Sequence, residues 1–206
     1  MNRSALGIQT EDNIKLREDI KKYPSITTIL KETETEEKKQ ALARWRLQVG
    51  DDKAEEIRQA AMERGRKIDA SVQDYLKTRT TGDRKLDLHL DQFEFVATEQ
   101  RVASEEWKVK GRFDAILRQG EDLIINDFKG SGKRKENKHL EDYILQLGAY
   151  WKILKDGGIL CTRGLLTIVV DEPAHIQPVW FTLAQMKSAA RGFEQRLKLY
   201  RELKGE

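Results

Sequence analysis

The sequence has very little cysteine and no long apolar run. Cys161 is the one cysteine among 206 residues, which excludes an internal disulfide and any zinc or iron–sulfur site that draws several cysteines from this chain. No apolar run approaches the ~20 residues that span a bilayer. The first residues contain no apolar segment typical of a signal peptide, and their acidic residues argue against a transit peptide. We therefore expect a soluble cytoplasmic protein without a membrane partner or an iron–sulfur cluster.

Neither sign of charge dominates, because 38 basic and 35 acidic residues leave a net charge of +3. The basic residues gather locally: residues 129–138 contain five lysines and arginines against one glutamate. A basic loop of this kind suits a phosphate backbone, although a solvated charged loop is the ordinary alternative. This loop therefore indicates nucleic-acid binding only if an active site lies beside it.

The order of the predicted elements indicates an α/β fold. Helices are expected at residues 26–30, 36–48, 53–77, 138–155 and 183–203, and strands at 93–102, 107–118, 122–128, 165–170 and 176–182. This order predicts a central mixed β-sheet flanked by helices, preceded by a helical addition. The length fits one domain, with an arm at residues 1–22, a helical region at 23–92 and a core at 93–206.

The chemistry is expected between residues 107 and 150, where two apolar strands form a hairpin turning at Gly120. Because side chains alternate along a strand, Asp127 and Lys129 should share one face and Phe128 should lie on the other. Asp114, on the neighbouring strand, could supply a second carboxylate. Two such carboxylates suit Mg²⁺ or Mn²⁺, and a lysine beside them could position or deprotonate a water. The alternative is a surface hairpin with a cross-strand ion pair.

Three short motifs follow one another in this stretch: Gly111-Arg-Phe-Asp114, Asp127-Phe-Lys129 and Gln146-Leu-Gly-Ala-Tyr150. In this order on strand, strand and helix, they resemble the RecB-type branch of the PD-(D/E)xK nuclease superfamily. The resemblance implies a restriction-endonuclease-like core and metal-dependent hydrolysis of phosphodiester bonds. It assigns metal binding to the two aspartates and water activation to the lysine. The glutamine would contact the water or the phosphate, and the tyrosine would pack at the site beside the nucleic acid.

A wider resemblance covers roughly residues 23–200. Pro24–Thr27, Arg44-Trp45 and Gly65–Lys67 are similar to segments of the mitochondrial genome maintenance exonuclease group and its phage relatives. The resemblance implies cleavage of single-stranded DNA ends with Mg²⁺ or Mn²⁺. It also implies that residues 24–66 form a helical arch through which a single strand passes.

Two further carboxylates are metal candidates. Counted from Gly65, RecB-type domains usually carry histidine and glutamate where this chain has Asp69 and Gln73. Asp69 could face the metal as an oxygen ligand, or it could be an ordinary surface residue. Glu99 matches a family glutamate near the site, and it could equally be an exposed strand residue.

Nucleic-acid contacts are expected from cations around the motifs, since phosphate contacts position a substrate without reading its sequence. The candidates are Arg112, Lys133, Arg134, Lys138 and, beside the site, Tyr150. Trp45 and Trp107 could stack on bases, although core packing is the ordinary alternative for both.

A nucleotide-binding interpretation can be set aside. Gly130-Ser-Gly132-Lys133 resembles a phosphate loop, but that loop requires G-x-x-x-x-G-K-[ST]. Asp127 stands where the first glycine is needed, and Arg134 stands where serine or threonine is needed.

The sequence thus predicts a Mg²⁺- or Mn²⁺-dependent deoxyribonuclease, an exonuclease acting on single-stranded DNA ends. Two alternatives remain open at this point. One is a structure- or sequence-specific endonuclease on the same fold, and the other is a catalytically inactive nucleic-acid-binding relative. The intact Asp114, Asp127 and Lys129 favour catalysis.

Overall fold

A five-stranded mixed sheet forms the centre of the computed structural model of the protein, which describes residues 18–205 apart from the side chains of Glu18, Asp19 and Lys138. The predicted N-terminal arm lies almost wholly outside this range. The strands lie in chain order, as β1 (Glu94–Ser104), β2 (Val109–Gln119), β3 (Asp122–Ser131), β4 (Arg163–Val170) and β5 (His175–Thr182). β3 and β4 are parallel, and the other neighbours are antiparallel. The predicted mixed sheet is therefore confirmed.

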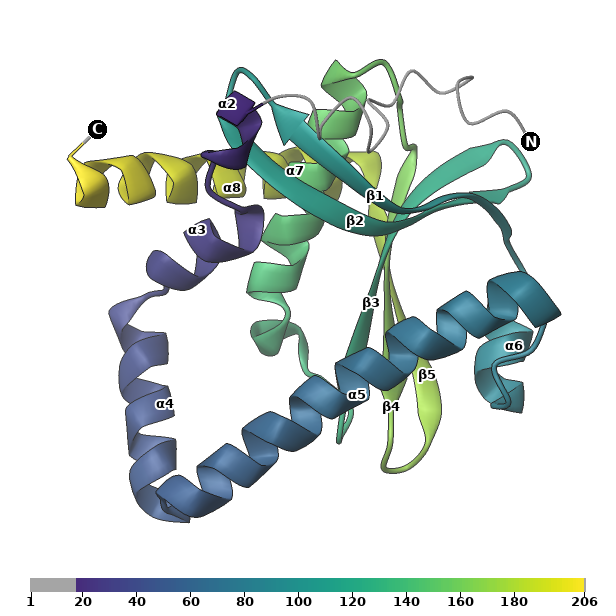
Figure 1. Ribbon diagram of the computed structural model, residues 1–206, viewed down its shortest axis with the longest axis horizontal. Helices are drawn as coiled ribbons and strands as arrows, with labels where there is room; N and C mark the ends of the chain where they lie inside the picture. Colours follow the sequence, from purple (N-terminus) through teal and green to yellow (C-terminus); the bar gives the residue numbers. More distant parts are fainter. Residues whose placement is uncertain (1–17, 206) are drawn as a thin grey trace.

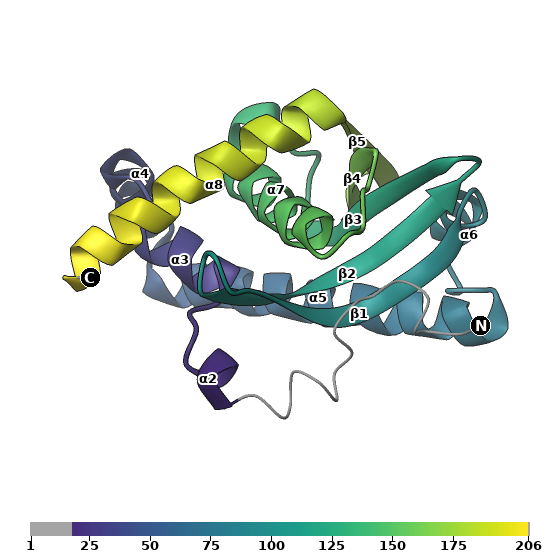
Figure 2. The ribbon, with the colours of Figure 1, turned by 90° about the horizontal axis from the view of Figure 1, so that it is seen from above.

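Helices cover both faces of the sheet (Figures 1 and 2). One face packs against α3 (Ile26–Glu32), α7 (Glu141–Asp156) and α8 (Leu183–Lys204), and the other against α5 (Asp51–Thr78) and α6 (Arg84–Leu90). The remaining elements are α2 (Glu18–Lys21), α4 (Glu36–Val49) and a 3-10 turn, η2 (Asn137–His139). The predicted α/β architecture with an added helical region is confirmed.

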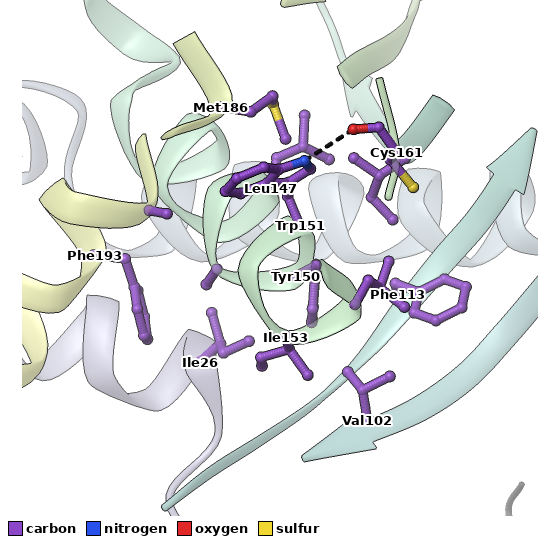
Figure 3. Packing of buried hydrophobic residues seen from close by; sticks show 14 of the residues in the cluster. Ile26, Val102, Phe113, Leu147, Tyr150, Trp151, Ile153, Cys161, Met186 and Phe193 are labelled. Carbon is purple, nitrogen blue, oxygen red and sulfur yellow. Dashed lines mark hydrogen bonds between the residues drawn. The ribbon is translucent and has the colours of Figure 1, made fainter. Parts of the chain in front are cut away.

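The two faces have separate cores, which follow from the alternation of side chains along each strand. Ile125 and Leu166 point towards α7, whereas their neighbours Ile124 and Leu165 point towards α5. Figure 3 shows the α7 side, where Trp151 also donates a hydrogen bond of 2.9 Å to the Cys161 carbonyl oxygen. β4 is buried on both faces, as its nearly continuous apolar run predicts.

Helix ends are set by local hydrogen bonds in two places and by a glycine in a third. Ser25 caps α3, since its Oγ accepts from the Thr28 amide at 3.0 Å. Thr182 and Gln185 form a capping box at the start of α8. Gly50, at φ +82°, ends α4 and is the N-cap residue of α5 without a side-chain cap, and Asp51 and Asp52 lie in the first turn of α5.

The α4 helix and the first half of α5 extend away from the sheet (Figure 1). α4 buries none of its residues, and its Leu47 side chain is 85% exposed. Along α5, burial resumes at Ile68 and continues to Tyr75, after an isolated contact at Ala54. Apart from Ala54, the buried residues of these two helices therefore lie in the second half of α5.

Among residues 18–205, no helix has both the length and the apolarity to cross a membrane.

Candidate active site

The candidate site lies where β2 and β3 separate. The last cross-strand pair towards the site is Ala115 with Asn126, and the next residues on the two strands are Asp114 and Asp127. The main-chain pairing stops there, and the Phe128 amide instead donates to Asp114 Oδ2 at 2.8 Å. The divergence of two strands thus opens a gap with one carboxylate on each side.

Asp127 is 1% exposed and is held by two neighbours on the α7 side of the sheet. Its Oδ1 accepts from Gln146 Nε2 at 3.2 Å, and Lys129 Nζ lies 2.6 Å from its Oδ2. The contact with Lys129 is an ion pair without the geometry of a directed hydrogen bond, so Oδ2 has no hydrogen-bond donor. Phe128 packs in the core on the opposite face. The predicted alternation along this strand is confirmed.

Lys129 has a neighbour that the sequence analysis missed. Its Nζ lies 5.3 Å from the centroid of the Tyr143 ring, and Lys135 Nζ lies 5.7 Å from the same centroid. Tyr143 precedes Gln146 by three residues, so the two lie on the same face of α7. That spacing is the signal from which Tyr143 could have been found.

Burial and mutual charge shift the pKa values of Asp114, Asp127 and Lys129. It raises the pKa of Asp114 to about 7, and the neighbouring Asp127 charge adds to the effect. Burial also raises the pKa of Asp127, against the opposing effect of Lys129. Although burial alone would lower the pKa of Lys129, the carboxylates of Asp127 and Asp114 more than offset it and raise that pKa. Negative charge in the gap is therefore costly unless a cation accompanies it.

The glycine of the first motif has a steric reason. A Cβ at Gly111 would lie 2.5 Å from Tyr150 Cε1, so only glycine admits the ring. Tyr150 is 3% exposed, and burial raises its pKa to about 12. The expectation that Tyr150 touches the nucleic acid is corrected here: the residue packs beneath the site and offers almost no surface to a ligand.

Glu99 lies beside the carboxylate pair. It falls opposite Asp114, between the pairs Thr98–Ala115 and Gln100–Phe113. Its φ is +54°, a left-handed value that is uncommon for a residue in a strand. Its carboxylate lies 2.6 Å from Arg112 Nη1, and burial raises its pKa despite that arginine.

Asp69 is exposed on α5, and its charge contributes to raising the pKa of both Asp127 and Glu99. Within residues 18–205, however, no three acidic, histidine or cysteine side chains approach closely enough to form a metal-binding cluster. The four predicted metal ligands are thus not assembled into one set. The structure brings Asp114 and Asp127 together, and Asp69 is near enough for its charge to act on Asp127 and Glu99.

The predicted nucleic-acid contacts are distributed around the gap. The Arg112 side chain is 56% exposed and ion-paired with Glu99, and Lys133 and Arg134 are exposed on the loop after β3. The side chain of Lys138 lies outside the described structure. Gln177 holds the loop, since its side chain exchanges hydrogen bonds of 3.0 and 2.8 Å with the main chain of Lys135.

The two tryptophans have different surroundings. Trp107 is buried, with its ring centroid 5.4 Å from that of Phe193. This is the core packing that was the ordinary alternative for it. Trp45 is half-buried on α4, a helix without buried residues.

Arg64 was also missed by the sequence analysis. A Cβ at Gly130 would lie 2.7 Å from Arg64 Cδ, so the glycine lets α5 cross directly over the end of β3. Arg64 Nε then donates to Asp171 Oδ2 at 3.1 Å, which ties α5 to the segment after β4.

The carboxylate pair fits a divalent cation. Asp127 Oδ2 is buried without a directed hydrogen-bond donor, and the two carboxylates share the ammonium of Lys129, so burial and the Asp127 charge still raise the pKa of Asp114. Mg²⁺ is commonly held by one or two carboxylates while it keeps several waters, so a third protein ligand is not required. Asp114 and Asp127 are the residues that would hold it.

A mixed β-sheet between helices, with a buried and a half-buried carboxylate and a lysine where two strands diverge, is the arrangement of a class of metal-dependent hydrolytic enzymes. The model of the PD-(D/E)XK nuclease superfamily matches residues 19–202, and the chain belongs to that superfamily. It is accordingly a nuclease with a nucleic-acid substrate, in a family that generally uses divalent metals such as Mg²⁺ or Mn²⁺.

Other comparisons add little. No curated protein matches the chain. Among solved structures, the crystal structure of SSO0001 is 17% identical with a TM-score of 0.41, and the match covers 74% of this chain and 68% of that chain. A likeness of this size carries no functional argument.

Proposed function

We propose that the protein is a Mg²⁺- or Mn²⁺-dependent DNA exonuclease that hydrolyses phosphodiester bonds at single-stranded ends, within the RecB-type branch of its superfamily. The observation that carries the proposal is the pair of carboxylates, Asp127 buried and Asp114 half-buried, with Lys129 Nζ 2.6 Å from Asp127 Oδ2. The order of the three motifs supports the branch, and the projecting α4–α5 region supports an activity at ends.

In this mechanism, Asp114 and Asp127 would hold one or two divalent ions at the gap between β2 and β3. When bound, a divalent ion polarises the scissile phosphate and lowers the pKa of an attacking water. Gln146 holds Asp127 Oδ1 through its amide, which keeps the carboxylate plane fixed. The Phe128 amide does the same for Asp114 Oδ2.

Lys129 acts as a charge and a hydrogen-bond donor. Its raised pKa keeps the ammonium protonated at neutral pH, so it orients the attacking water or a non-bridging phosphate oxygen and does not remove the water's proton. Tyr143 limits the positions open to the ammonium, because the ring lies 5.3 Å from Nζ. The reaction adds water across one P–O bond, which leaves a phosphomonoester on one product and a hydroxyl group on the other.

The projecting residues 36–66 support a preference for DNA ends. They extend beside the site without a hydrophobic core of their own (Figure 1). Leu42 and Leu47 are exposed and Trp45 is half-buried on α4. Apolar and aromatic groups of this kind can stack on the bases of any single strand. A strand that must pass between this region and the sheet would have to enter by an end.

The test is digestion of a linear and a circular single-stranded DNA of the same sequence, end-labelled where linear, with Mg²⁺, Mn²⁺ or EDTA. We expect short labelled products from the linear strand alone, and only with metal. Cleavage of the circle would establish an endonuclease instead. Binding without any cleavage would establish the inactive relative, and the same digestion on RNA tests the choice of sugar. Lys129→Ala is the control for contaminating nucleases.

A further inference from the structure

A hollow of about 470 Å³ lies at the turn between β1 and β2, away from the carboxylate pair. Its walls come from three segments: the residues after α2, the turn itself and the C-terminal part of α8 (Figure 2). Lys108, on the turn, precedes Asp114 by six residues, which is roughly 20 Å along an extended strand. A volume of this size is typical of small-molecule sites. This hollow is hereafter the turn hollow.

Three cations line the turn hollow without an acidic partner. Lys22 follows α2, Lys108 lies on the turn and Arg201 lies near the end of α8. Among the side chains that the structure describes, no carboxylate forms an ion pair with any of the three. The acidic residue of the lining, Glu106, is already paired with Lys152 at 3.1 Å. The turn hollow therefore has an excess of positive charge that an anion would neutralise.

Two of these cations are held in place by the fold. Arg201 is half-buried, and its Nη2 donates to the Trp107 carbonyl oxygen at 2.9 Å. This bond orients the planar guanidinium and leaves further N–H donors for a ligand. Lys108 has a φ of +46°, a left-handed value that is uncommon for a residue other than glycine or asparagine. Backbone conformations of this kind are concentrated at functional sites, ligand clamps among them.

Two half-buried tyrosines give the turn hollow aromatic walls. Tyr23 follows Lys22, and Tyr200 precedes Arg201 on α8. The Tyr23 hydroxyl donates to Glu105 Oε2 at 2.9 Å, which orients that ring. Aromatic rings stack on any nucleobase, because every base has a π-face. The cations and the rings together favour a ligand that is both anionic and aromatic.

We propose that the turn hollow binds a nucleoside monophosphate at a site separate from the carboxylate pair. The phosphate lies between Lys108 and Arg201, and the base lies against Tyr23 or Tyr200. A phosphomonoester carries a charge of about −1.5 to −2 at neutral pH, which suits several unpaired cations. Phosphodiester hydrolysis leaves phosphomonoesters, so the activity of the superfamily supplies ligands of this class. The proposal goes beyond the proposed function and does not depend on where in a strand the enzyme cuts.

The first experiment is calorimetric titration of the intact protein in EDTA with deoxyadenosine monophosphate, deoxyadenosine or inorganic phosphate. We expect the monophosphate to bind about tenfold or more tightly than either fragment, because it alone contacts both the cations and the rings. No binding of the monophosphate, or equal affinity for inorganic phosphate, overturns the proposal.

A charge variant locates the ligand. Lys108→Asn/Arg201→Gln removes two charges, while asparagine tolerates the left-handed backbone and glutamine can still donate to the Trp107 carbonyl oxygen. Affinity for the monophosphate should fall about tenfold or more. The control Lys187→Gln/Lys198→Gln removes two exposed charges from α8 and should keep the wild-type affinity. Unchanged affinity in Lys108→Asn/Arg201→Gln, with a folded circular dichroism spectrum, overturns the proposal.

A variant of the candidate active site separates the two sites. Lys129→Ala should bind deoxyadenosine monophosphate in EDTA as tightly as the wild type, because the turn hollow lies at a distance from Lys129. A loss of binding in Lys129→Ala would place the nucleotide at the carboxylate pair and would overturn the proposal. These titrations involve no cleavage, so their results are independent of the digestion that tests the proposed function.

Discussion

Residues 36–66, the helical projection, differ from the sheet and α7 in how many of their side chains are buried. α7 buries eight of its residues, whereas α4, only slightly shorter, buries none. Gln146 and Tyr143, which lie against Asp127 and Lys129, come from the packed helix. Side chains on α4 are free of core constraints and remain available to a ligand. The contrast teaches that apolar spacing along a helix marks burial only where a second element lies against it.

The largest effect is expected on cleavage, from substitutions in the packed region. Asp127→Asn and Lys129→Ala should each lower the cleavage rate by about 10³-fold or more, because a metal ligand or the charge next to the water is lost. The measurement is single-turnover digestion of linear single-stranded DNA. Lys152→Ala, at an exposed ion pair on the same α7 helix, should cleave at close to the wild-type rate. Near-normal cleavage by either site variant would place the active site elsewhere.

The second effect measures the packing contrast directly with one substitution in each region. Leu147→Ala, at a residue that is 0% exposed, should lower the free energy of unfolding by about 2–5 kcal/mol. Leu47→Ala on α4 should change it by about 0.5 kcal/mol or less, because the side chain is already in water. Urea unfolding of the two variants gives both values. A large loss in Leu47→Ala would mean that α4 packs against a partner in solution, and the contrast would fail.

The third effect concerns the ionisation of Asp114 and the pH dependence of the free energy of unfolding. The pKa of Asp114 is about 7 in the folded protein and near 3.8 when unfolded. Between these values the folded state binds more protons, so the free energy of unfolding falls as pH rises from about 4 to 7. In EDTA, Asp114→Asn should remove this loss, which is at most about 4 kcal/mol for a shift from 3.8 to about 7, and so stabilise the protein at pH 8 while abolishing cleavage.

The control for Asp114→Asn is Mg²⁺. Adding the ion should stabilise the wild-type protein at pH 8 and should stabilise Asp114→Asn much less, because a bound cation compensates the ionised carboxylate. Thermal unfolding at pH 5 and pH 8, with and without the metal, gives all four comparisons. A wild-type stability that is flat or rises over this pH range would contradict the assignment of buried charge to Asp114.

The smallest effect is expected at Asp69, which lies between the two regions on α5. Because it is exposed and outside any metal cluster, its charge acts at a distance and is screened. Asp69→Ala should change the Mg²⁺ concentration for half-maximal rate by about threefold or less, and Asp69→His should leave the ratio of Mn²⁺- to Mg²⁺-supported rates nearly unchanged. A change of tenfold or a clear shift towards Mn²⁺ would make Asp69 a ligand in the working enzyme.

The strands and motifs were predictable from the sequence because their signals are local. Alternation of side chains along β3 predicted that Asp127 and Lys129 share one face of the sheet and that Phe128 lies on the other. What could not be predicted depends on contacts between distant segments. Spacing within one element does not show that Tyr150 packs on Gly111 or that Arg64 crosses over Gly130. Nor does it show that Leu47 has no neighbouring element to cover it.

The hydrogen bond from the Phe128 amide to Asp114 Oδ2 makes one main-chain proton part of the site. Asp114 Oδ2 becomes a weaker hydrogen-bond acceptor when its carboxylate is protonated or binds a cation. The Phe128 amide resonance is therefore a built-in spectroscopic probe: its chemical shift and its solvent exchange should follow occupancy of the gap by proton or metal. Titrations observed at this one nucleus could rank metals and inhibitors without any substrate present.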